Sequence, residues 1–134
     1  MPKKLTEQEK KRRAILIRMM LDLNAAVSAL PDRHEVCMIM LAARLGVYQG
    51  KPMDVSALAA LVDLPRATAT RHIRALEAAG RVTTEMEGRR LVVRPSNGES
   101  DHGGRLYRRI EHTARTTIHD LSRMDSLTFD IHAG

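Results

Sequence analysis

Hydrophobic residues recur at helical spacing from Ala14 onward, and the flanking residues mark where a first helix begins and ends. Thr6 and Glu9 have the spacing of a capping box, and Pro31 interrupts the pattern. The apolar positions of this run cover more of the helix surface than packing against one core requires. The pattern therefore predicts a long first helix, part of whose surface contacts a second subunit.

A second helix is predicted directly after Pro31. Asp32 suits its N-cap, Glu35 follows three residues later, and Gly46 suits its C-terminal end. The apolar positions between them have helical spacing: Val36, Ile39, Met40, Ala43 and Leu45. We expect this helix to bury one face in a core.

Two further short helices are predicted before the pattern changes. Asp54 suits the N-cap of a helix that runs through Val62, and the sequence Asp-Leu-Pro at 63–65 breaks it. Pro65 fits the first turn of the next helix, which extends to Gly80. Two short helices therefore meet at a tight turn.

After Gly80 the apolar period becomes that of a strand. The sequence predicts strands over 81–86 and 89–94, separated by a turn at Glu87 and Gly88. Residues 96–104 are polar and rich in glycine, which is typical of a flexible connection. The order helix, turn, helix, hairpin is that of a winged helix-turn-helix.

A last helix is predicted from about Arg105 to Met124. Its expected apolar stripe consists of Leu106, Ile110, Ala114, Thr117 and Leu121. In the tail from Asp125, the apolar residues Leu127, Phe129 and Ile131 alternate, so we expect an extended docked segment or a frayed end. The fold class expected is mostly α with a small β-hairpin wing, and long N- and C-terminal dimerisation helices.

Composition narrows the choice of partners. The 134 residues suffice for one domain, and 17 of the 22 Lys and Arg are Arg within a formal charge of +6. Arginine suits phosphate and guanine edges, whereas two Tyr, one Phe and no Trp argue against stacking on unpaired bases. A single Cys and the lack of a membrane-spanning or signal segment favour the cytoplasm. Duplex DNA is therefore the favoured anionic partner.

The winged-helix segment also resembles a known family. The stretch VSALAALVDLPRATATRHIRALEAAGRV, from Val55 to Val82, is similar to the winged-helix region of MarR-type bacterial transcription regulators. The resemblance implies a dimer held by interlocking terminal helices and a wing that reaches a neighbouring minor groove. The quoted stretch is 28 of the 134 residues, about a fifth of the chain. The implied organisation is a dimerisation helix over 1–30, a DNA-binding domain over 31–95, a linker over 96–104, and a dimerisation helix with a tail over 105–134.

The fourth predicted helix presents a small, cationic face. Ala69, Ile73, Leu76 and Ala79 form its apolar side, and Ala67, Thr70, Arg71, Arg74 and Ala78 lie opposite. Small residues let the backbone approach the bases, and Arg can contact phosphate or guanine. Arg66 and Thr68 add polar groups at the positive end of the helix dipole. We therefore predict DNA contacts at Arg66, Thr68, Thr70, Arg71 and Arg74.

Arg89 and Arg90 follow the hairpin turn and are the wing's candidate DNA contacts. MarR-type wings are usually longer and carry an Asp-x-Arg element, whereas Glu87-Gly88-Arg89 stands here. Minor-groove insertion and simple phosphate contact by the two arginines both stay open.

The remaining candidate residues favour structural roles. His72 lies at the margin of an apolar face, and Cys37, three residues after His34, is more simply a buried thiol than a redox sensor. His112 and His119 share a face with Arg105, Arg108 and Arg115, whose charge opposes a metal cation. No catalytic motif is present, so we expect neither enzymatic activity nor a cofactor or metal.

The sequence thus predicts a homodimeric regulator in the bacterial cytoplasm, associated with the nucleoid, that binds an inverted repeat in duplex DNA and acts as a repressor. Two alternatives remain: a plasmid or mobile-element DNA-binding protein, and a winged helix that docks another protein. A small-molecule effector is a further open question, for which the scarcity of aromatic residues offers little support. No membrane partner is expected.

Overall fold

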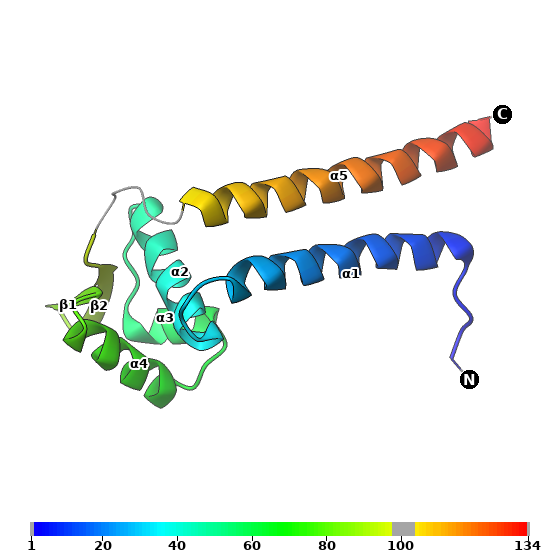
Figure 1. Ribbon diagram of the computed structural model, residues 1–134. Coiled ribbons are helices and arrows are strands. Elements are labelled where there is room, and N and C mark those ends of the chain that lie inside the picture. The colour runs from blue at the N-terminus through cyan, green and yellow to red at the C-terminus, as the bar shows by residue number, and fades with distance from the viewer. Residues whose placement is uncertain (1, 98–103, 134) are drawn as a thin grey trace. The chain divides into compact units, whose positions relative to one another are not determined.

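The computed structural model describes residues 2–97 and 104–133, with side chains up to residue 126. Its elements in chain order are α1 (Glu7–Ser28), α2 (His34–Tyr48), α3 (Val55–Leu61), α4 (Arg66–Ala78), β1 (Val82–Glu87), β2 (Arg90–Pro95) and α5 (Gly104–Ala133) (Figure 1). They form two compact units, one of α1 and α5 and the other of α2 to β2. The predicted fold class, mostly helical with a hairpin wing, is confirmed.

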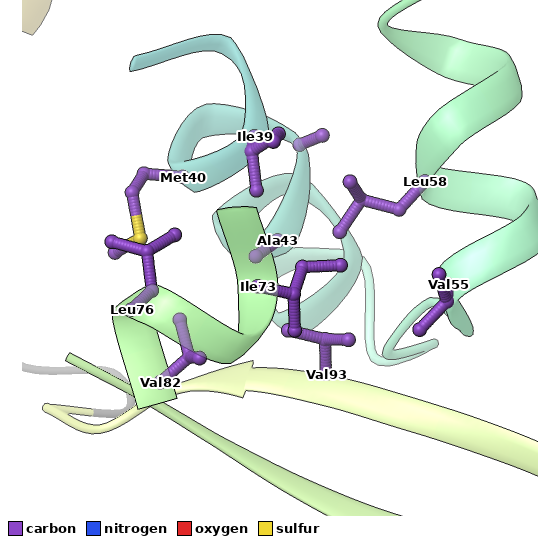
Figure 2. Packing of buried hydrophobic residues seen from close by; sticks show 10 residues of the cluster. Ile39, Met40, Ala43, Val55, Leu58, Ile73, Leu76, Val82 and Val93 are labelled. Carbon is purple, nitrogen blue, oxygen red and sulfur yellow. The ribbon is translucent and has the colours of Figure 1, made fainter. Parts of the chain in front are cut away.

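The core of the second unit forms where α2, α3, α4 and the hairpin meet. Its buried cluster comprises Ile39, Met40, Ala42, Ala43, Val55, Leu58, Ile73, Leu76, Val82 and Val93. Figure 2 shows side chains from all four parts pointing into one space. Ile39, Leu58 and Val93 have no exposed surface. Each short helix therefore buries one side in a shared core, which leaves its other side to solvent.

The hairpin is offset by one residue from its predicted position. Val82 pairs with Pro95 and Glu87 pairs with Arg90, so the turn consists of Gly88 and Arg89. Gly88 has a φ of 64°, which glycine adopts without strain at the first position of a two-residue hairpin turn. The predicted turn at Glu87 and Gly88 was therefore wrong by one position, and Arg90 belongs to β2.

Both predicted ends of α2 were wrong. Arg33, not Asp32, occupies the N-cap and makes no capping bond with its side chain. The Asp32 carboxylate instead accepts two hydrogen bonds from the Arg81 guanidinium, at 2.8 and 2.7 Å. Gly46 is buried inside the helix, where an added Cβ would lie 3.0 Å from the carbonyl oxygen of Lys51. Gly46 thus permits close packing of the following loop instead of ending the helix.

The first unit pairs two long helices. The predicted capping box is confirmed: Thr6 Oγ1 accepts from the Glu9 amide at 3.1 Å, and Glu9 Oε2 accepts from the Thr6 amide at 2.8 Å. A set of large apolar side chains on α1 is nevertheless 40 to 61% exposed: Leu16, Ile17, Met20 and Leu21. The broad apolar surface predicted for this helix is therefore only partly covered by the rest of the chain.

α5 differs from its prediction in phase and length. Thr113 is buried and Ala114 is exposed, so the buried stripe is rotated from the predicted one. Threonine is tolerated there because the Thr117 hydroxyl donates to the Thr113 carbonyl at 2.8 Å. The helix continues to Ala133, so the predicted end near Met124 and the extended tail were wrong.

The predicted flexible connection falls mostly outside the described residues, which omit 98–103. Among the helices that the structure describes, none is long and apolar enough to cross a membrane.

Candidate nucleic-acid interface

Local chemistry fixes the start of α3, the turn that follows it and both ends of α4. Asp54 Oδ1 accepts from the Ala57 amide at 2.7 Å and so caps α3 as predicted. Asp63 adopts a φ of 56° in the turn, a left-handed conformation that Asp tolerates better than most residues. Pro65 stands at the N-cap of α4, and Gly80, with a φ of 74°, follows its end. The chain can therefore reverse between two helices that pack on one core.

α4 divides into a buried side and an outward side. Ala69, Ile73 and Leu76 are buried, whereas the exposed positions at the opposite side are Ala67, Arg71, Arg74, Ala75 and Ala78. Apart from two arginines, this outward face holds only alanine. It is thus a surface that a groove of DNA can approach closely, with two guanidinium groups able to reach its edges.

Thr68 and Thr70 lie at the two margins of the outward face and are half-buried. The prediction placed Thr70 fully outward. In the structure Thr70 lies between the buried side that contains Ala69 and the outward face, so its side chain is partly covered. Arg66 is exposed in the first turn. Residues 66–70 of α4 therefore offer one free guanidinium and two partly covered hydroxyls.

Three of the candidate arginines gather around Asp54. Arg66, Arg89 and Arg90 line a hollow of about 200 Å³ together with Asp54, Val55, Ser56 and Leu91. Arg90 Nε donates to Asp54 Oδ2 at 2.8 Å. The amide of Ala57 and then the guanidinium of Arg90 hold the pKa of Asp54 below its usual range. Asp54 thus joins the wing to the start of α3.

The remaining arginines of this segment are engaged within the fold. Arg81 pairs with Asp32, and this hydrogen-bonded pair lowers the pKa of Asp32 and raises that of Arg81. Arg94 contacts Glu85 at 3.7 Å and Glu87 at 2.9 Å across the hairpin. In the described part of the chain, Arg66, Arg71, Arg74 and Arg89 form no ion pair. These four carry the segment's available positive charge.

Sequence reasoning missed the roles of Asp54 and Asp32 as partners of arginine. The pairs join positions 36 and 49 residues apart. Helical spacing and local capping rules link only near neighbours, so they identified Asp54 as a cap and gave no indication of Arg90.

Two residues considered for other chemistry are structural. His72 Nε2 lies 2.7 Å from Glu35 Oε2 and ties α4 to α2. Cys37 is buried, and its Sγ lies 3.5 Å from the Asp32 carbonyl. Burial, followed by the Asp32 charge, raises the pKa of this thiol, which disfavours the reactive thiolate. Within the described residues, no three His, Cys, Asp or Glu side chains group to hold a metal ion.

Solved structures share this fold. A protein of unknown function from Listeria innocua Clip11262 superposes with a TM-score of 0.62 at 13% identity, over 90% of this chain and 87% of that one. The transcriptional regulator Tm0710 from Thermotoga maritima superposes with a TM-score of 0.53 at 14% identity, over 90% of this chain and 85% of that one. The multiple antibiotic-resistance repressor MarR from Listeria monocytogenes 4b F2365 superposes with a TM-score of 0.53 at 14% identity, over 92% of this chain and 88% of that one. No protein-family model and no curated protein matches the sequence. The likeness establishes a winged helix fold.

Proposed function

We propose that this chain is a MarR-type transcriptional regulator that binds double-stranded DNA through α4. The observation that carries the proposal is the outward face of α4, where Arg71 and Arg74 stand exposed among alanines opposite a buried edge. A helix of this kind fits the major groove, since alanine lets the backbone approach and Arg forms forked contacts with guanine or phosphate.

The start of α4 and the wing would contact the phosphate backbone. Arg66 lies at the positive end of α4, and Arg89 lies in the hairpin turn on the same hollow. Arg90 Nε donates to Asp54, so only the terminal N–H groups of this guanidinium would contact a phosphate. Thr68 and Thr70, being half-buried, would contribute a hydroxyl each at the edges of the groove.

The proposed active form is a homodimer. In the single chain, α1 exposes an apolar surface to solvent, which consists of Leu16, Ile17, Met20 and Leu21. A second copy would bury it by two-fold symmetry. Such a dimer binds an inverted repeat whose half-sites lie about 34 Å apart, one helical turn of DNA. Occupation of such a site in a promoter would repress transcription in the cytoplasm.

Substitution of the two outward arginines tests the proposal. Operator DNA is first selected from genomic fragments, and binding of Arg71→Ala and Arg74→Ala is then measured by fluorescence anisotropy. If the arginine reads a base, its substitution should weaken binding by about 1 to 3 kcal/mol. If it contacts only phosphate, the substitution should reduce the slope of log affinity against log salt concentration by about one unit. Arg33→Ala, an exposed arginine outside α4, is the control of equal charge.

Three results would contradict parts of this proposal. Unchanged affinity and salt slope in both α4 variants would remove α4 as the reading element. Binding without preference over competitor DNA would favour the protein-docking alternative. Footprints confined to a replication origin would favour the plasmid or mobile-element alternative over promoter control.

A further inference from the structure

The solvent side of α5 concentrates cations along one line. At 3.6 residues per turn, eight positions between 105 and 123 fall within an arc of about 120°. These positions, which we call the α5 basic face, are Arg105, Arg108, Arg109, His112, Arg115, Thr116, His119 and Arg123. All eight side chains are exposed. Glu111 and Asp120 lie on either side of the arc and outside it, so the face itself contains no carboxylate.

This arrangement is not visible in the net charge of the region, because positive and negative residues cancel in the sum. Residues 95–134 contain five Arg against six Asp and Glu, a net charge of −1. Helical geometry places all five Arg on the α5 basic face. The start of α1 differs, since there Lys3 and Lys10 pair with Glu9 and Glu7.

Few carboxylates of the chain neutralise the charge of the arginines on this face. Among the described residues, Arg105, Arg108, Arg109 and Arg123 form no ion pair. Arg115 contacts Glu111 at 3.0 Å, but both side chains are more than 60% exposed, so the pair holds the guanidinium weakly. Ordinary surfaces intersperse both signs, whereas a single-sign strip is suited to an anionic partner.

We propose that the α5 basic face is a second DNA-binding surface, which contacts the phosphate backbone of duplex DNA without reading bases. Every permanent cation on it is Arg, whose planar fork matches phosphate oxygens better than the ammonium of Lys. From Arg105 to Arg123 the face is about 27 Å long at 1.5 Å per residue, comparable to about eight successive phosphates of one strand.

A membrane surface fits this helix less well. A helix that lies on a bilayer needs a free apolar side, often with Trp or Phe, opposite its cations. On α5, Leu106, Thr113 and Thr117 are buried within the fold, and two of these three are polar. Ile118, 63% exposed, is the one large apolar side chain that the described part of α5 leaves mostly exposed, which is too little for an apolar side that enters a bilayer. A duplex, which needs only the charged side, is the partner that the burial favours.

The test compares two triple variants of the full chain with equal loss of charge. Arg105→Gln, Arg108→Gln and Arg109→Gln remove three of the five arginines of the α5 basic face. The matched control combines Lys4→Gln, Lys11→Gln and Arg13→Gln, all exposed on or before α1. Binding to a 30-base-pair random-sequence duplex is measured from low to physiological salt. We expect the α5 triple to flatten the log–log salt slope by about two to three units, and the control by less than one.

Each other outcome counts against the inference. Equal changes in both triples would show a general charge effect and overturn it. Loss of binding to vesicles with 30% phosphatidylserine, together with unchanged DNA binding, would assign the face to membranes. The inference extends the proposed DNA binding to a second surface, and the two fail differently. If the wild type binds the duplex but the α5 triple matches the control, only this inference fails; if the wild type binds no duplex, both fail.

Discussion

The two units of this protein bury hydrophobic side chains to very different degrees. All ten residues of the main core cluster belong to the unit of α2 to β2. In the described part of the α1 and α5 unit, the buried residues are Ala26, Leu106, Thr113 and Thr117, while α1 leaves four large apolar side chains exposed. The winged-helix unit thus has its own core, whereas the described side chains of the paired helices leave an apolar surface exposed on α1.

The core of the winged-helix unit gives the largest expected effect. Leu58→Ala removes a side chain with no exposed surface from the centre of the cluster and leaves a cavity. We expect the free energy of unfolding to fall by about 2 to 5 kcal/mol. Urea denaturation followed by circular dichroism measures the change.

Leu61→Ala on the same helix is the control, since Leu61 is 54% exposed. It should change stability by less than about 0.5 kcal/mol. Equal effects at the two positions would contradict the assignment of this core.

The paired helices should respond through association instead. Met20→Glu places a charge on the exposed apolar surface of α1, and burying that charge in a dimer is costly. We expect the dimer dissociation constant to rise by about 100-fold, measured by sedimentation over a range of concentrations. Met86→Glu is the matched control, because Met86 in β1 is 59% exposed and Met20 is 61% exposed. Association that resists Met20→Glu would place the dimer contact elsewhere.

The sequence predicted elements well wherever neighbouring residues decide the structure. The cap at Asp54, the capping box at Thr6 and the strand period after Gly80 depend on groups within a few residues, and all three are present. The ends of α2 were wrong because distant groups decide them. Asp32 is engaged by Arg81, and Gly46 is required by the loop that packs on it.

The same distinction holds for the candidate site. Helical phase placed Arg71 and Arg74 outward, because α4 is a short helix on a single core. It did not separate Arg90, held by Asp54, from Arg89, which forms no ion pair in the described part of the chain. For α5, the prediction chose the apolar Ala114 for the buried stripe, whereas the structure buries Thr113. A buried threonine is possible in a helix because its hydroxyl can donate to a carbonyl of the preceding turn, as that of Thr117 does.

The Asp54 link between wing and helix should give an intermediate effect that depends on pH. Asp54→Ala removes the cap and the Arg90 partner, and should cost about 1 to 2 kcal/mol. Asp54→Asn keeps a capping oxygen, loses the charge and should cost less. Because the pKa of Asp54 is lowered by folding, its contribution is complete above the unfolded pKa of about 4 and is lost as pH falls through the folded pKa.

Urea denaturation at pH 7 and at pH 3 measures this dependence. The difference in stability between wild type and Asp54→Asn should narrow at pH 3. A constant difference would show that folding does not lower the pKa of Asp54.

The smallest effect is expected at the other capped helix start, in the unit of α1 and α5. Thr6→Ala removes one accepted hydrogen bond from the exposed start of α1, while the Thr6 amide can still donate to Glu9. We expect a cost of about 0.5 to 1 kcal/mol, confined to the first turn and seen as faster hydrogen exchange of the Glu9 amide. Thr116→Ala, an exposed threonine within α5, should be neutral or slightly stabilising, because Ala is the better helix former. If Thr6→Ala instead destabilised the chain as much as Asp54→Ala, the two units would unfold together, and the start of α1 would be coupled to the core of the winged helix.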